Sequence, residues 1–293
     1  MRYGLSIPNF GDTFQPRTLA DLARQAEDAG WDGFFLWDHV LFDSLPTADP
    51  WIALAAVALA TERILIGPMV TPLPRRRITK LARETVTLDH LSHGRLILGV
   101  GSGIHEWELA QLGDTADAKQ RGAMLDEGLA LLNELWSGDP INHQGTHYTA
   151  QPMIESSGPG RFLPTPVQQP RIPIWVAGMW PNKPPFRRAA RWDGVFPLAA
   201  QGSLDGPDLT PAHLRDLTAF TLAQRTATPP FDVVIAGVTP DPASARATTA
   251  AYEEAGATWW IEDISPWAFG WGDGQPWPTE AITARIRQGP PTK

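Results

Sequence analysis

The sequence predicts an α/β protein, a single (β/α)8 barrel of the TIM type, in which parallel strands form a ring inside a layer of helices. Two observations predict this fold. Short apolar runs typical of strands buried on both faces alternate with longer runs of helical spacing along the chain. Together they make about eight strand–helix units, the number that a closed barrel needs. An open doubly wound sheet is the alternative, but it usually has fewer strands.

The first four expected strands are short apolar runs, at residues 3–8, 33–37, 63–70 and 95–100. Each precedes a segment with apolar residues at helical spacing, at residues 19–29, 51–60, 79–91 and 124–136. Gly30 and Gly138 mark helix ends, and Asp49 followed by Pro50 is a typical helix start.

The alternation breaks at residues 139–171, which are rich in Pro, Gly and polar residues. Long loops in compact domains are usually functional, so we expect this insertion before the fifth strand, with residues 266–278, to define the substrate. Further strands at residues 172–177, 194–198, 231–236 and 258–264 alternate with helices at 186–192, 211–225, 243–255 and 279–287. No segment has the composition of a domain linker, so we expect one domain over residues 1–293.

The composition argues against several classes of protein. The formal net charge is −8 and no basic run stands out beyond Arg75-Arg76-Arg77, so we expect no nucleic-acid partner. The sequence has no Cys, which excludes disulfides and thiolate chemistry. No apolar run approaches the roughly 18 residues of a membrane span. The N-terminus also lacks the pattern of a signal peptide, so we expect a cytoplasmic protein that does not bind membranes.

The active site of a barrel lies at the C-terminal ends of its strands. The second expected strand ends in Asp38 and His39, which we interpret as catalytic, because His moves protons near neutral pH and a neighbouring carboxylate can orient it. In the alternative interpretation, Asp38 caps the next segment and His39 is a satisfied residue of the wall. Aromatic faces can line an apolar pocket, and the candidate substrate-binding residues at strand ends and loops are Asn9, Trp37, Trp180 and Trp267.

Other polar motifs favour structural interpretations. Glu106 and Glu108 fit the start of a helix better than catalysis, with Arg121 as the expected partner of Glu108. The run Arg75-Arg76-Arg77 is more typical of a solvated loop or a subunit contact than of a binding site. His143 and His147 have no third ligand at metal spacing, so we expect no metal site.

Several segments, in this order and spacing, carry a resemblance to a known family. They are WDH at 37–39, DPW at 49–51, VTPLPRRR at 70–77, LARE at 81–84, TLD at 87–89, LSHGR at 91–95, LGVGSG at 98–103, GTHY at 145–148 and RRAARWDG at 187–194. The chain resembles the luciferase-like monooxygenases, the flavin- and F420-dependent oxidoreductases of the bacterial luciferase superfamily, over nearly its whole length.

The resemblance implies that FMN or the deazaflavin coenzyme F420 lies over the C-terminal mouth of the barrel. It also implies a bulge with a non-prolyl cis peptide within residues 68–70. In deazaflavin-using relatives, the His that matches His39 sits beside the redox-active carbon of the ring. In the relative that oxidises a sugar phosphate, a catalytic Glu directly follows the Gly-Ser/Thr-Gly triplet. This chain has Ile104 there, which puts that activity in doubt.

The resemblance implies three sets of cofactor contacts. In the first set, one face of the ring contacts the third strand. In the second, the cofactor tail contacts the glycine turn, whose small residues let backbone N–H groups approach an anion. The third is a set of backbone donors at the end of the fifth strand. The residues are Met69, Val70 and Thr71; Gly101, Ser102 and Gly103; and Ala177, Gly178 and Met179. A tight strand-to-helix turn is the alternative interpretation of Gly101–Gly103.

These features predict an oxidoreductase that exchanges a hydride between F420 and a small organic substrate. Asp38, His39 and the Ala-, Pro- and Arg-rich composition favour F420. The alternative is an FMN-dependent monooxygenase that uses O2 and reduced FMN, so a separate flavin or F420 reductase is a candidate partner. An alternative of another class is a non-catalytic ligand-binding or partner-subunit barrel, against which the glycines and Asp38-His39 argue. A homodimer is left open.

Overall fold

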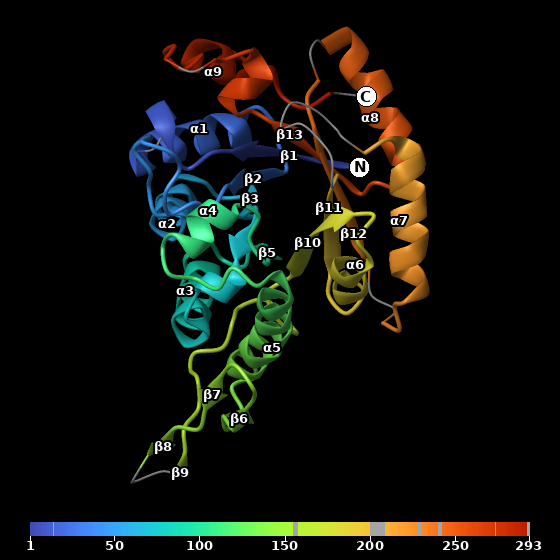
Figure 1. Ribbon diagram of the computed structural model, residues 1–293. Helices are drawn as coiled ribbons and strands as arrows, with labels where there is room; N and C mark the ends of the chain where they lie inside the picture. The colour runs from blue at the N-terminus through green and yellow to red at the C-terminus, as the bar shows by residue number, and fades with distance from the viewer. Residues whose placement is uncertain are drawn as a thin grey trace.

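Parallel strands form a ring in the computed structural model, which describes residues 1–13, 15–154, 158–199, 209–227, 230–239, 242–272 and 274–291 (Figure 1). In sheet order the strands run β3-β2-β1-β13-β12-β11-β10-β5-β4. Their bounds are β1 Arg2–Ile7, β2 Gly33–Leu36, β3 Leu65–Pro68, β4 Thr71–Pro72, β5 Leu98–Gly101, β10 Ile174–Trp180, β11 Gly194–Ala199, β12 Asp232–Gly237 and β13 Trp259–Asp263.

The ring closes because β3 and β4 are two parts of one barrel strand. β3 pairs with β2, whereas β4 pairs with β5. A bridge between Ile66 and Leu96 joins β3 to the segment just before β5. The predicted (β/α)8 barrel is therefore confirmed.

Helices cover the outside of the ring (Figure 1). The long ones are α1 Pro16–Asp28, α2 Pro50–Ala60, α3 Ile78–Leu91, α5 Ala118–Ser137, α7 Pro211–Ala223, α8 Pro242–Glu254 and α9 Thr279–Gln288. The short ones are η1 Gly11–Thr13, η2 Leu73–Arg75, α4 Glu106–Ala110, α6 Lys183–Ala189 and η3 Pro266–Phe269. The expected cap is present, since the Asp49 carboxylate accepts hydrogen bonds from the backbone N–H groups of Trp51 and Ile52, both at 2.9 Å. None of the helices in the described ranges is long and apolar enough to cross a membrane.

Two apolar cores explain why the strands read as continuous apolar runs. One lies between the sheet and the helices, and the other fills the inside of the ring. The inner core contains Phe35, Met69, Ile97, Trp175, Phe196, Val234, Trp259 and Ile261. Partly exposed side chains that pack on this inner core include Val70, Ala177, Leu198 and Ala236.

The third strand breaks between Met69 and Val70, whose peptide bond is cis, within the range that the resemblance implies. Glycines let the neighbouring backbones approach here. A Cβ on Gly67 would lie 1.9 Å from the Ile97 carbonyl oxygen, and one on Gly99 would lie 2.3 Å from that of Pro68. Val70 consequently stands directly against β5.

The insertion forms two antiparallel strand pairs that extend from α5 (Figure 1). They are β6 His143–Gln144 with β7 Thr149–Ala150, and β8 Met153–Ile154 with β9 Gly158–Pro159. Its backbone is held by Glu127 of α5, which accepts from residues 146–148, and by Asp89 of α3, which accepts from residues 167 and 168. It enters β10 at its N-terminal end. Residues 139–171 therefore lie outside the loops at the C-terminal strand ends, and a role for them in defining the substrate stays a prediction.

Candidate active site

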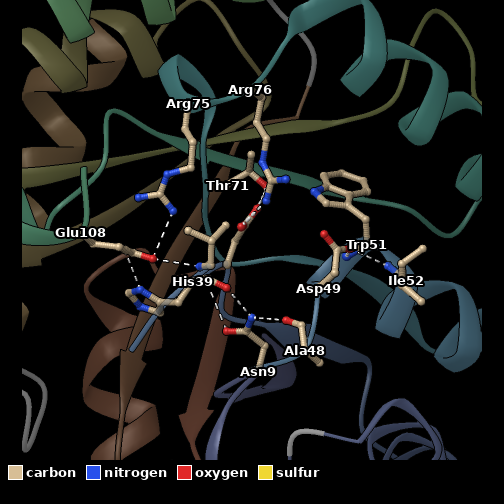
Figure 2. Close-up of polar contacts among 12 residues, drawn as sticks. Asn9, His39, Ala48, Asp49, Trp51, Ile52, Thr71, Arg75, Arg76 and Glu108 are labelled. Atoms are coloured by element: carbon tan, nitrogen blue, oxygen red, sulfur yellow. Dashed lines mark hydrogen bonds and ion pairs between the residues drawn. The ribbon is translucent and has the colours of Figure 1, made fainter. Parts of the chain in front are cut away.

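A buried carboxylate holds His39, which follows β2. The Nδ1 of His39 lies 3.0 Å from Oε2 of Glu108 in α4, and the Glu108 side chain is only 3% exposed. Oε1 of Glu108 accepts hydrogen bonds from the backbone N–H groups of Val40 at 2.9 Å and Leu41 at 3.3 Å. Figure 2 shows the contact between His39 and Glu108. Glu108 thus fixes both the imidazole and the loop that carries it.

Arg75 balances the charge of this carboxylate. Its Nη1 lies 3.1 Å from Oε1 of Glu108 (Figure 2). Its Nε lies 3.3 Å from Oδ2 of Asp114. Burial raises the pKa of Glu108, but hydrogen bonds from His39 and Arg75 outweigh it and lower the pKa to about 2. Glu108 is therefore ionised at neutral pH.

Asp38 does not orient His39 as expected. Its buried carboxylate accepts a 2.6 Å hydrogen bond from the Thr71 hydroxyl and is paired with Arg76. Asp38 therefore ties the loop after β2 to the loop after β4. The orienting carboxylate for His39 is Glu108.

Two further expectations are corrected. Arg75 and Arg76 are neither a solvated loop nor a free surface for a subunit, since their side chains are 8% and 16% exposed and paired with carboxylates. The expected partner of Glu108, Arg121, instead donates to the carbonyl oxygens of residues 102, 115 and 116. Sequence spacing could not reveal these pairs because they join separate loops.

Asn9 is fully buried and engaged with the backbone. Its side-chain amide donates to the carbonyl oxygens of His39 and Ala48, both at 2.7 Å (Figure 2). Asn9 therefore positions the segment that carries His39. A contact between Asn9 and a substrate stays a prediction.

The predicted cofactor residues meet at an apolar surface. A Cβ on Gly101 would lie 3.1 Å from Cγ2 of Val70 and 3.7 Å from Cβ of Ala177, so a side chain there would fill this surface. Gly103 has a φ of +89°, in the left-handed region that favours glycine. Gly178 packs against α6, where its Cβ would lie 2.3 Å from Pro185.

The remaining predicted cofactor residues are buried in the core or bonded to other groups of the protein. Met69 is buried in the inner core, and the Thr71 hydroxyl is used by Asp38. The carbonyl oxygen of Ser102 accepts from Arg121, and that of Met179 accepts from the backbone of Asn182. Their contacts with a cofactor stay predictions.

Unpartnered polar atoms accompany the apolar surface. Among the described residues, Arg75 Nη2, Arg76 Nε and Ser265 Oγ are buried at the C-terminal strand ends without a hydrogen-bond partner. An apolar surface with polar donors around it suits a flat ring that has polar edges. The residues present therefore fit a flavin-type ring.

Two of the three predicted tryptophans come together. The rings of Trp37 and Trp267 are nearly parallel, at 7°, with centroids 6.1 Å apart. Trp180 instead packs on Phe186 and Phe220, and the Lys183 ammonium lies 3.5 Å from the centroid of its ring. Trp37 and Trp267 thus form one wall, and Trp180 belongs to another contact region.

A second histidine was missed as a site residue. The ring centroid of His105 lies 5.4 Å from that of His39. Burial lowers the pKa of His105, and the neighbouring His39 lowers it further. His105 and Glu108 are one helical turn apart, and this spacing was the signal that could have linked both to one site.

Comparison with known proteins agrees with this architecture. The family model described as luciferase-like monooxygenase matches residues 1–261, so the chain belongs to the luciferase-like monooxygenase family. The chain is 39% identical over 178 residues to the F420-dependent glucose-6-phosphate dehydrogenase of Beutenbergia cavernae, covering 58% of this chain and 49% of that protein. It spans about half the length of the curated dehydrogenases it matches.

Two solved structures share the fold. An F420-dependent secondary alcohol dehydrogenase in complex with an F420-acetone adduct has a TM-score of 0.70 and 17% identity, covering 90% of this chain and 94% of that one. The oxygenating constituent of 3,6-diketocamphane monooxygenase from Pseudomonas putida, in complex with FMN, has a TM-score of 0.64 and 22% identity. That alignment covers 84% of this chain and 70% of the other.

Proposed function

We propose that this protein is an oxidoreductase that exchanges a hydride between coenzyme F420 and a small organic substrate. The observation that carries the proposal is the chain of contacts from Arg75 through Glu108 to His39, beside an apolar surface that fits a flavin-type ring. The F420-dependent relative at 39% identity supports the choice of coenzyme.

His39 acts as the proton carrier in this proposal. The ionised Glu108 favours the tautomer whose proton is on Nδ1, which leaves Nε2 of the neutral ring as an acceptor. His39 takes a proton from a substrate hydroxyl during oxidation and returns it during reduction. Glu108 stabilises the charged imidazole, and Arg75 keeps Glu108 ionised.

The coenzyme supplies the hydride chemistry when it is bound. Val70, Gly101 and Ala177 hold the flat ring by apolar contact, and the turn at Gly103 holds the polar tail. The nearly parallel pair Trp37 and Trp267 forms a wall that limits access of water.

Absorbance titrations of the purified protein with oxidised and reduced F420, and separately with FMN, test the proposal. We expect saturable spectral changes with F420, and transfer of hydride only with that coenzyme. Saturation by reduced FMN alone, with uptake of O2, would replace the proposal by the FMN monooxygenase. No spectral change with either coenzyme would favour the non-catalytic barrel.

A further inference from the structure

Basic residues are scarce in the loops at the C-terminal strand ends. Apart from Arg75-Arg76-Arg77, the segments that join these strand ends to the next helices contain no Lys or Arg, whereas most of them contain Asp or Glu. The nearby cations Arg17, Lys119 and Lys183 belong to the first turns of α1, α5 and α6. A phosphorylated substrate would therefore find few basic side chains in these segments.

Two of the three arginines in these loops have carboxylate partners. Arg75 is paired with Glu108 and Asp114, and Arg76 is paired with Asp38. The charge of each is thus compensated by a buried carboxylate, Glu108 for Arg75 and Asp38 for Arg76. Arg77 is exposed and precedes α3.

The same loops expose apolar side chains next to His39. Val40 is 44% exposed, Leu41 42%, Ile104 51% and Trp107 37%, and we call these four residues the apolar rim. Val40 and Leu41 lie in the loop after β2, Ile104 lies in the loop after β5, and Trp107 lies in α4. Glu108 of α4 joins these segments by accepting from the backbone of Val40 and Leu41.

Aromatic rings connect the apolar rim to the wall of the site. Phe42 lies 6.2 Å from Trp107 and 5.8 Å from Trp267, measured between ring centroids. His105 lies 5.4 Å from both Trp107 and His39. The exposed apolar surface is therefore continuous with the residues around the proton carrier, where a substrate would cover it.

We propose that the site takes an uncharged, predominantly apolar alcohol or ketone, whose hydrocarbon part covers the apolar rim, and does not take a phosphorylated sugar. This inference rests on the proposed function. During oxidation, the carbinol C–H bond breaks and its electron pair leaves as hydride to the oxidised deazaflavin. The hydroxyl proton passes to His39 and the C=O double bond forms; reduction of the ketone reverses each transfer.

Two measurements test the substrate class. Ligand-observed NMR gives dissociation constants for butanone, hexanone, octanone and glucose 6-phosphate, with the protein saturated in oxidised F420. Turnover with reduced F420 is measured for the same ketones, and with oxidised F420 for glucose 6-phosphate. We expect each added methylene to tighten ketone binding about two- to fourfold, the range for partial to full burial of a methylene. Glucose 6-phosphate should bind more weakly than octanone.

Variants locate the effect on the apolar rim. Trp107→Ala should reduce the gain per methylene, whereas Leu222→Ala, which removes a 46% exposed leucine on α7, should leave it unchanged. Equal affinity along the ketone series, or tighter binding of glucose 6-phosphate that Arg77→Ala abolishes, would overturn the inference. Hexylamine, a cation of similar length, is measured in the same way. Tighter binding of hexylamine than of hexanone would also overturn the inference, which requires an uncharged substrate. If the absorbance of F420 does not change when the protein is added, the proposed function fails. The substrate inference is then tested on its own, by measuring ketone binding without coenzyme.

Discussion

His39 and Glu108 are 69 positions apart in the sequence, yet Nδ1 of the imidazole and Oε2 of the carboxylate lie 3.0 Å apart. The contact joins the loop after β2 to α4. It gives the site one fixed imidazole, and the first prediction addresses that ring.

Replacing His39 with Ala should lower turnover about 10²–10⁴-fold, because a positioned acid–base group contributes that much. Coenzyme affinity, measured by absorbance titration, should change much less. His213→Ala on α7 is the control and should keep normal turnover. Normal turnover in His39→Ala would remove His39 from the reaction, and a defect in coenzyme binding alone would reassign it to the wall.

Glu108→Gln keeps the shape of the side chain but removes its charge. Arg75 then loses its buried counter-charge, so we expect the free energy of unfolding to fall by about 3 kcal/mol. Turnover should fall about tenfold or more, because the charged imidazole of His39 loses its stabilising partner. Denaturant unfolding and steady-state rates measure the two effects. Glu106→Gln, at an exposed position in the same helix, should change neither.

The lowered pKa of Glu108 predicts a dependence of stability on pH. The carboxylate has a pKa of about 2 in the folded chain and an ordinary value of 4.5 when unfolded. Its contribution, up to about 3 kcal/mol, is therefore present above pH 4.5 and is lost as the pH falls towards 2. We expect the difference in free energy of unfolding between the wild type and Glu108→Gln to be smaller at about pH 4 than at pH 7. The same difference at both pH values would contradict a stabilising role of the ionised Glu108.

Gly101→Ala tests the apolar surface. The new methyl group would stand 3.1 Å from Val70 and 3.7 Å from Ala177, where the ring is proposed to lie. We expect coenzyme affinity to fall about tenfold, within the range typical of overpacking. Gly122→Ala on α5, whose Cβ would meet only Arg188 at 3.5 Å, is the matched control. Unchanged coenzyme affinity in Gly101→Ala would contradict the proposed position of the ring.

Asp38→Asn separates structure from chemistry. Because Asp38 contacts Arg76 and Thr71, we expect this change to lower thermal stability. Turnover per folded molecule should fall much less than in His39→Ala. A loss of turnover as large as that of His39→Ala, at unchanged stability, would restore Asp38 as a direct participant.

Local patterns predicted the barrel because buried parallel strands are continuously apolar and helix caps such as Asp49 are local. The same logic placed His39 and Gly101 at strand ends. It failed for Glu108 and Arg75, because ion pairs between loops depend on how the strands are arranged around the ring. The charge run at Arg75-Arg76-Arg77 looked solvated in the sequence, and its buried partners lie far along the chain.

The insertion is a suitable place to attach a tag to this protein. The strand pair β8–β9 lies at the tip of the insertion, away from the barrel, and Met153 in β8 is 71% exposed (Figure 1). Glu127 and Asp89 hold the two ends of the insertion by accepting hydrogen bonds from the backbone of Tyr148 and Val167. Changes at the tip should therefore leave the C-terminal strand ends undisturbed. A fluorescent tag or an affinity peptide grafted at this tip would report on or immobilise the protein while leaving the mouth of the barrel open.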